Sequence, residues 1–225
     1  MTRKMLVFEI LLIAAALAAT ALLYPHLPAQ VPTHWNISLQ PDHTMPKWTT
    51  FLLGPALLGA ITTITFLLPW LSPRDFQVNG FRATYRQVML ILFALWTFLY
   101  AAILWAGFGH PLQAGRAIAV GYCLGFVLFG NVMGKVRRNF FIGVRTPWTL
   151  TNDRVWNASH RFAGKAWVAA GLLGLIFEIF GLHAGPAIAL LAAWLSPKVY
   201  SLVIYKQLER RGEIGDGLAR EQGEA

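Results

Sequence analysis

The residues of this chain best suited to recognition lie in one connection between two apolar runs, residues 135–165. That connection supplies guanidinium, indole and imidazole groups, from Arg145, Trp148, Trp156, His160 and Arg161. Groups of these kinds build surfaces that recruit a protein, and they also anchor loops at the headgroup layer of a membrane. Gly143 and Thr146-Pro147 favour a sharp turn here, because glycine accepts unusual backbone angles and proline disfavours helix at the residue before it.

Catalytic groups are scarce. Glu9 and Glu178 are the acids within apolar runs, and in a spanning arrangement they lie far apart along the membrane normal. They therefore cannot act as a paired acid and base. The sequence holds no Gly-x-Ser-x-Gly, His-Glu-x-x-His or phosphate-binding glycine loop. We predict that the chain is not an enzyme and holds no cofactor.

A second set of polar groups lies in the proline-rich segment 25–47. Its candidate recognition residues are His34, Trp35, Asn36 and Asp42. Imidazoles and carboxylates are ligands for zinc or copper, but the segment has no tight pair of ligands, so we predict surface histidines and no metal site. Five prolines prevent regular helix over most of the segment, and we expect it to be ordered and extended.

Composition sets the elements that must position these residues. Of 225 residues, 56% are hydrophobic and 13% are charged, so most of the surface must face lipid. A bilayer core takes about 20 apolar residues as one helix. Six such runs are present: Met5–Tyr24, Trp48–Leu71, Val88–Phe108, Ala117–Gly134, Ala163–Leu182 and Ala184–Tyr205. The alternation typical of barrel strands is absent from them, so we predict an all-α integral membrane protein with six transmembrane helices.

The 19 Lys and Arg residues predict which side each connection faces. All but Lys47 and Arg116 fall at the N-terminus, in even-numbered connections or in the C-terminal part. The positive-inside rule then puts both termini and the basic connections in the cytoplasm. Lys198 lies inside the last span, and we expect it to snorkel toward the inner surface. Arg3 and Lys4 before an apolar run also fit a signal peptide, but the run reaches spanning length and predicts a retained helix.

Small residues predict how two spans pack. Small-xxx-small pairs occur on the fourth and fifth spans, namely Gly121 with Gly125, Gly130 with Gly134, and Ala170 with Gly174. Such pairs let helix backbones approach closely, so we predict that these two spans pack together within one chain. Cys123, the single cysteine, lies in mid-span and is expected to be a packing residue without a disulfide.

The residues after the turn predict a short helix over 152–160. Thr151 is suited to cap its N-terminus, and an acid follows in the first turn, where the helix dipole favours it. Val155, Trp156 and Ser159 share one face of this helix. We therefore expect a short interfacial helix before the fifth span.

A longer motif surrounds the turn. It reads Gly130-Asn131, then Asn139-Phe140-Phe141-Ile142-Gly143-Val144-Arg145-Thr146-Pro147-Trp148-Thr149-Leu150, then Val155-Trp156, His160-Arg161 and Gly164-Lys165. Over about residues 121–205 the chain closely resembles the SdpI family, bacterial membrane proteins whose named member confers immunity to a secreted toxin peptide. The resemblance gives the candidate functional residues of the cytoplasmic motif: Asn139, Gly143, Arg145, Thr146, Pro147, Trp148, Thr149, Trp156, His160 and Arg161.

The outward segment resembles the small domain DUF1648 through Pro32-Thr33-His34-Trp35-Asn36, Pro41-Asp42 and Pro46-Lys47. That domain commonly has glycine before its Pro-Asp step, near where this chain has Leu39, so the turn is expected to differ. The predicted regions are 1–71 (DUF1648-like, two spans and the loop 25–47), 72–116 (connection and third span), 117–207 (SdpI-like, three spans and the loop 135–161) and 208–225 (disordered tail).

The resemblance implies an immunity or signal-transducing protein of the bacterial cytoplasmic membrane. Its implied partners are the lipid bilayer, a secreted toxin peptide at the outer face and a cytoplasmic repressor, with no direct nucleic acid, and the resemblance leaves the oligomeric state open. Outer groups such as His34, Trp35 and Asp42 are expected to contact the peptide. The cytoplasmic motif is expected to form a compact surface that changes conformation or recruits a protein.

A small transporter or permease is the alternative. Glu178 and Asn131 are the polar groups that such a protein would place along a path through the membrane, and Pro197 would break a helix. The two halves of the chain do not repeat each other, which removes the inverted-repeat argument for this alternative.

Overall fold

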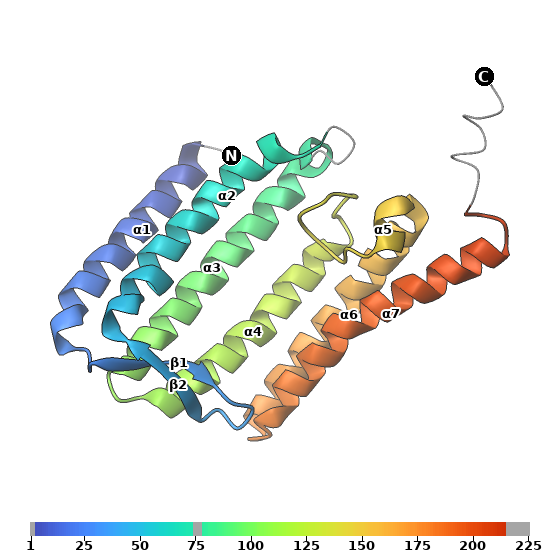
Figure 1. Cartoon of the computed structure of the whole chain (residues 1–225). Coiled ribbons are helices and arrows are strands. Elements are labelled where there is room, and N and C mark those ends of the chain that lie inside the picture. The colour runs from blue at the N-terminus through green and yellow to red at the C-terminus, as the bar shows by residue number, and fades with distance from the viewer. Residues whose placement is uncertain (1–2, 74–77, 215–225) are drawn as a thin grey trace.

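The computed structural model describes residues 3–73 and 78–214, which form seven α-helices and one β-hairpin (Figure 1). The helices are α1 (Arg3–Leu23), α2 (Leu57–Leu71), α3 (Arg82–Gly107), α4 (Pro111–Met133), α5 (Pro147–Thr151), α6 (Asp153–Ile179) and α7 (Ala184–Arg210), and the strands are β1 (Gln30–Trp35) and β2 (Pro41–Pro46). The predicted tail, 208–225, begins inside α7, and residues 215–225 lie outside the described part.

Six of the described helices are long and apolar enough to cross a membrane, which confirms the predicted number of spans. Two of them begin well before the predicted apolar runs, α3 at Arg82 rather than Val88 and α6 at Asp153 rather than Ala163. The second span is Lys47–Leu71, in which α2 continues the short 3-10 and π-helical turns that precede it. Hydropathy marks only the part of a helix that lies in hydrocarbon, whereas backbone hydrogen bonding continues the helix into the polar headgroup layer.

The segment 25–47 folds into a hairpin, so the all-α expectation is incomplete. Strands β1 and β2 pair antiparallel. Asn36 builds the turn between them, because its side-chain Oδ1 accepts the N–H groups of Ser38 and Gln40 at 2.9 and 3.0 Å. Both strands of a two-stranded sheet are edge strands, and edge strands tolerate proline. The prolines that exclude helix therefore do not exclude this hairpin.

Helices α1 to α4 follow one another in a row, and α6 and α7 complete the bundle beside α4 (Figure 1). Helices α4 and α6 approach closely, since a Cβ on Gly130 would lie 2.8 Å from the carbonyl oxygen of Gly164. This contact confirms the predicted pairing of the fourth and fifth spans within one chain. Gly121 and Gly125 face α3 instead, where they lie against Phe98 and leucine side chains.

The bundle has two distinct ends. The hairpin end carries β1 and β2, and the loop end carries residues 134–152 together with the start of α1 and the end of α7 (Figure 1). Of the described Lys and Arg residues, Lys47 and Arg116 lie at the hairpin end, Lys198 lies within α7, and the others lie toward the loop end.

The side chain of Lys198 does not turn toward the loop end, the end that the charge distribution predicts to be cytoplasmic. Its Nζ donates to the carbonyl oxygen of Trp194 at 2.8 Å and lies 3.0 Å from the centroid of that ring. Side chains on a helix slant toward the N-terminus of their own helix, and α7 begins at the hairpin end. Lys198 therefore reaches toward the hairpin end.

The predicted short helix before the fifth span is not a separate element, because α6 is continuous from its first residue. Asn152, rather than Thr151, caps it: Asn152 Oδ1 accepts the N–H groups of Arg154 and Val155 at 2.9 and 3.2 Å. A different short helix, α5, precedes this cap and starts at the Thr-Pro step. Proline fits the first helical position, because the N–H of a residue there makes no hydrogen bond within the helix and its absence in proline costs nothing.

Candidate functional site

Residues 136–149 fold over the start of α6 and form what we call the loop clasp. Asn139 shapes its first half from a fully buried position. Its Nδ2 donates to the carbonyl oxygens of Arg137 and Ile142, at 2.8 and 3.0 Å, and its Oδ1 accepts the N–H groups of Phe141 and Ile142, at 2.8 and 2.7 Å. An amide side chain supplies two donors and an acceptor together. Asn139 is thus the structural centre of this turn.

His160 closes the second half of the loop clasp. Its Nε2 accepts the N–H of Val144 at 3.0 Å, and its Nδ1 lies 2.8 Å from the carbonyl oxygen of Trp156. A ring nitrogen that accepts from an amide carries no proton, so the imidazole is neutral with its proton on Nδ1. Gly143 has φ +115°, and a Cβ at this position would overlap the His160 ring. Glycine is therefore required where the chain passes over the ring.

Trp156 lies beneath this ring. The two rings stack with centroids 4.0 Å apart and an interplanar angle of 19°. The indole Nε1 donates to the carbonyl oxygen of Val136, the first residue of the loop clasp, at 2.8 Å. Trp156 and His160 thus each bind the loop clasp through one main-chain hydrogen bond, to Val136 and Val144 respectively. Both aromatic residues are buried, and Trp156 packs in a cluster with Tyr85 and Met133. As predicted, Val155 and Ser159 share the buried face of α6 with it.

Thr146 and Thr149 fasten α5 to the rest of the structure. The N–H of Thr146 donates to Thr149 Oγ1 at 2.8 Å, and the N–H of Thr149 donates to Thr146 Oγ1 at 3.2 Å, which is a reciprocal capping box. Ser201 on α7 receives the Trp148 Nε1–H and lies 3.3 Å from Thr146 Oγ1. The predicted motif therefore links the loop clasp to α7 as well as to α6.

The compact surface predicted for the motif is smaller than expected. Trp156, His160, Asn139 and Thr149 are buried, so they cannot contact a partner directly. The exposed motif residues are Arg145, Pro147 and Arg161, with Trp148 partly exposed. Arg145 Nη1 donates to the carbonyl oxygen of Phe140, which holds the guanidinium against the outside of the loop clasp. Within the motif, burial separates residues that shape the loop from residues that a partner can reach.

At the hairpin end, the predicted outer residues are brought together. His34 Nδ1 and Asp42 Oδ1 lie 2.6 Å apart on neighbouring strands, and both side chains are exposed. Trp35 Nε1 donates to the carbonyl oxygen of Pro111 at 2.8 Å, which ties β1 to the first residue of α4. Asn36 forms the turn rather than a contact surface. Among the described residues, no three His, Cys, Asp or Glu side chains converge as metal ligands.

The turn of the hairpin has a backbone conformation that glycine favours at Leu39, near the position where DUF1648 commonly has glycine. Leu39 has φ +59°, the left-handed region, and it is the only described residue other than glycine with a positive φ. Leu39 therefore adopts a backbone conformation that glycine accepts without strain. The leucine side chain faces a hollow between the hairpin and the bundle.

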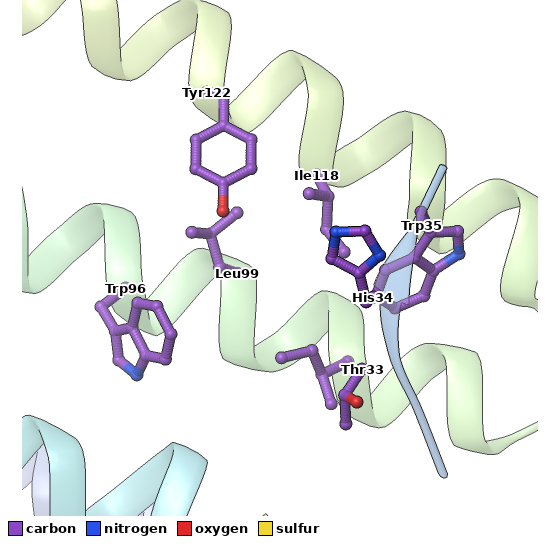
Figure 2. A pocket seen from close by; sticks show the side chains of 8 residues that line it. Thr33, His34, Trp35, Trp96, Leu99, Ile118 and Tyr122 are labelled. Atoms are coloured by element: carbon purple, nitrogen blue, oxygen red, sulfur yellow. The ribbon is translucent and has the colours of Figure 1, made fainter. Parts of the chain in front are cut away.

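Two adjoining hollows lie between the hairpin and the helices, and we call them together the hairpin crevice. Trp35, Ile118 and Tyr122 line both hollows, whose volumes are about 170 and 270 Å³. Figure 2 shows the smaller one, with Tyr122 and Ile118 on α4, Leu99 on α3, and His34 and Trp35 on β1. The larger one continues to Leu190 on α7. The lining of the hairpin crevice is mainly apolar, and the hairpin adds polar residues to it, Thr33 and His34 in the smaller hollow and Asn36 in the larger one, which we call its polar rim.

The two intramembrane polar candidates are not brought together. Glu178 is buried near the hairpin end, where its Oε2 lies 3.3 Å from His183 Nδ1, and His183 Nε2 lies 3.2 Å from Arg116. Asn131 is exposed near the loop end of α4, next to the contact of α4 with Gly164. Fourteen helical residues separate Gly164 from Glu178, about 20 Å at 1.5 Å per residue. The described part of the chain shows no polar path that joins them.

Sequence reasoning missed three residues that complete these sites. A single hydroxyl in an apolar run, such as Ser201, carries little signal, because serine and threonine are common in membrane helices, where they bond to the backbone or to neighbouring helices. Ile118 and Tyr122 were passed over as ordinary span residues. Their spacing of four places them on one face of α4, and this spacing is the signal that would have grouped them.

Comparisons with known proteins match the two regions that hold these features. Residues 135–204 match the SdpI/YfhL protein family, and residues 11–59 match DUF1648, a domain of unknown function. The chain is 24% identical over 174 residues to the Immunity protein SdpI of Bacillus subtilis (strain 168), a stretch that covers 77% of this chain and 81% of that protein. These matches confirm both predicted resemblances. No solved structure matches the chain.

Proposed function

We propose that this protein is an integral membrane immunity protein that binds a secreted, membrane-active peptide at its hairpin end. The observation that carries the proposal is the hairpin crevice, an apolar hollow with a polar rim at one end of a six-helix bundle. The likeness to the Immunity protein SdpI supports the immunity role.

The hairpin crevice suits one or a few side chains of an amphipathic peptide. The larger hollow, about 270 Å³, lies just below the usual range of small-molecule sites, about 300–1,000 Å³. Ile118 and Tyr122 offer apolar surface inside, while His34 and Asp42 offer hydrogen bonds at the rim. A peptide that buries an apolar side chain here and keeps its polar face at the rim is withheld from the bilayer.

In this proposal the hairpin end faces the outside of the cell. The support is the concentration of Lys and Arg at the loop end, since short connections rich in these residues stay in the cytoplasm. A secreted peptide then meets the hairpin before it meets the hydrocarbon core.

The loop clasp would report the bound peptide to the cytoplasm. Trp35 fixes the hairpin to the start of α4, and α4 packs against α6, whose first turns hold the loop clasp through Trp156 and His160. A shift of α4 along α6 changes the position of the loop clasp, as small helix shifts do in other switching proteins. Arg145 and Trp148, which partners can reach, would then recruit a cytoplasmic repressor.

Survival of a sensitive bacterial host, challenged with purified secreted membrane-active peptides, tests this proposal. Ile118→Trp fills the hairpin crevice, and we expect it to abolish protection. Ile188→Trp is the matched control, because Ile188 is 61% exposed on the lipid-facing side of α7, and we expect it to protect as the parent does. Equal protection by both variants, at equal membrane levels, would remove the hairpin crevice from the mechanism.

Two further variants separate the later steps. Arg145→Ala is expected to lose repressor recruitment to the membrane, measured by fluorescence localisation of the tagged repressor, without loss of peptide binding. Glu178→Gln is expected to keep protection. Loss of protection in Glu178→Gln together with loss of coupled ion flux would favour the transporter alternative.

A further inference from the structure

A long groove runs along the contact of α4 with α6, at the loop end and away from the hairpin crevice. Its volume is about 600 Å³, and it is shallow and widely open to the outside of the bundle. Glycines form its floor, at Gly130, Gly134 and Gly164. Because these residues have no side chains, the two backbones meet and leave an unfilled channel above them.

The walls of the groove differ along the membrane normal. Lys135, Arg161 and Lys165 stand at its loop end, and all three side chains are exposed. Val168 and Leu172 line the part nearer the middle of α6, where Leu172 is 49% exposed. The groove is therefore cationic where the headgroup layer lies and apolar where hydrocarbon lies.

No acid among the described residues neutralises the three cations. Asp153, at the start of α6, pairs with Arg138, and Glu213 pairs with Arg154. Within residues 3–73 and 78–214, none of the three groove cations forms a salt bridge. Arg161 and Lys165 are also four residues apart on one helix face, a spacing at which like charges repel each other. A bound anion would remove this repulsion.

We propose that this groove binds one anionic glycerophospholipid from the leaflet on the loop side. The lipid phosphate accepts hydrogen bonds from Arg161, Lys165 and Lys135, and the guanidinium of Arg161 suits two phosphate oxygens at once. One acyl chain lies on the glycine floor against Val168 and Leu172.

The dimensions of the groove agree with this occupant. Eleven helical residues separate Arg161 from Leu172, about 16 Å at 1.5 Å per residue. Half of a hydrocarbon core of about 30 Å is about 15 Å, the depth that one acyl chain reaches. A lipid with its phosphate at Arg161 therefore lays most of one acyl chain along the groove as far as Leu172. A soluble anion would use the cations and leave the apolar part of the groove empty.

Native mass spectrometry of the full chain, released from mixed micelles, tests the proposal. The probes are palmitoyl-oleoyl phosphatidylglycerol and palmitoyl-oleoyl phosphatidylcholine, which share acyl chains and differ in net charge. We expect one phosphatidylglycerol per protein to be retained at least tenfold more strongly than phosphatidylcholine. The variant Arg161→Gln/Lys165→Gln should lose this preference, whereas Arg161→Lys should keep most of it.

The matched control is Arg210→Gln/Arg211→Gln, which removes the same charge from exposed positions at the end of α7, outside the groove. We expect this control to change retention less than twofold. Ala169→Phe keeps every cation and fills the apolar part of the groove, so it should also weaken retention. Thermal unfolding in detergent should be alike for all variants, because the changed side chains are exposed.

Three outcomes would overturn the proposal. An equal loss in the two double variants would mean diffuse attraction to the whole basic end. Equal retention of the two lipids would mean apolar contact without headgroup recognition. Full displacement of phosphatidylglycerol by millimolar inorganic phosphate would mean a site for a free anion.

Discussion

His160 Nε2 accepts the main-chain N–H of Val144 at 3.0 Å, across sixteen residues of sequence. This bond decides where the chain passes as it leaves the first half of the loop clasp, because no water reaches a donor buried at this depth. The histidine of the motif therefore acts as an internal acceptor for the backbone. Its role is to place Arg145 and Trp148 at the surface rather than to meet a partner itself.

Replacing this acceptor should destabilise the loop clasp. His160→Leu keeps an apolar side chain and leaves the Val144 N–H without a partner, at a cost of about 1–3 kcal/mol. His160→Gln keeps a carbonyl oxygen that can accept and should cost less. Unfolding in sodium dodecyl sulfate, followed by tryptophan fluorescence, measures both. Equal stability of the leucine variant and the parent would show that the bond is dispensable.

Gly143→Ala should destabilise the protein for two reasons that can be separated. The backbone at φ +115° strains any residue with a Cβ, and this Cβ would overlap the His160 ring. We expect a loss of about 1–3 kcal/mol. Adding His160→Ala removes the overlap but not the backbone strain, so the double variant should cost less than the sum of the single ones. Additive losses would place the whole cost in the backbone.

The motif could be found from the sequence, but the depth of its residues could not. Thr146-Pro147 and Gly143 indicated a turn, and the face shared by Val155 and Trp156 was predicted from helical spacing. Burial of His160 depends on how far the loop folds back over α6, and that path is set by hydrogen bonds between residues distant in sequence, Val144 with His160 and Val136 with Trp156, which no local spacing predicts. The predicted contact surface was therefore too large.

Leu39 should be a site where glycine is better than alanine. Both Leu39→Gly and Leu39→Ala lose the same contact with the hairpin crevice, but only alanine retains the strain of the left-handed backbone at φ +59°. We expect Leu39→Gly to be the more stable by about 1 kcal/mol. Thermal unfolding in detergent compares the two variants directly. A less stable glycine variant would mean that the turn adopts another conformation.

The hairpin crevice lay beyond sequence reasoning because its lining comes from four separate elements. Trp35 on β1, Leu99 on α3, Tyr122 on α4 and Leu190 on α7 converge only after the hairpin docks on the bundle. That docking depends on Gly115, where a Cβ would lie 2.8 Å from the Trp35 ring. Hydropathy shows where each helix lies in the sequence, but it does not show which helices pack against each other in the bundle.

Ser201→Ala should loosen α5 from α7. The change removes the acceptor of the Trp148 indole N–H and a partner of Thr146, with an expected loss of about 1–3 kcal/mol. Limited trypsin digestion of inverted vesicles should then cleave faster at Arg145. Ser196→Ala is the control, since its hydroxyl bonds only within its own helix, to Ala193. Equal cleavage rates in the two variants would argue against the link between α5 and α7.

Gly130, within α4, and Gly134, directly after its last residue, should respond to alanine in opposite ways. At Gly130 a Cβ would meet main-chain atoms of α6, 2.8 Å from the Gly164 oxygen and 2.9 Å from the Val168 nitrogen. Backbone cannot rotate aside as a side chain can, so Gly130→Ala must push the helices apart, at a cost of about 1–3 kcal/mol. At Gly134 the nearest atom is 3.8 Å away, on the Arg161 side chain, and the backbone has φ −65°, which alanine adopts without strain. Gly134→Ala should therefore be neutral or stabilising by up to about 1 kcal/mol, because alanine lowers the conformational entropy of the unfolded chain. Unfolding in sodium dodecyl sulfate measures both changes, and equal destabilisation would mean that α4 and α6 are not in contact at Gly130.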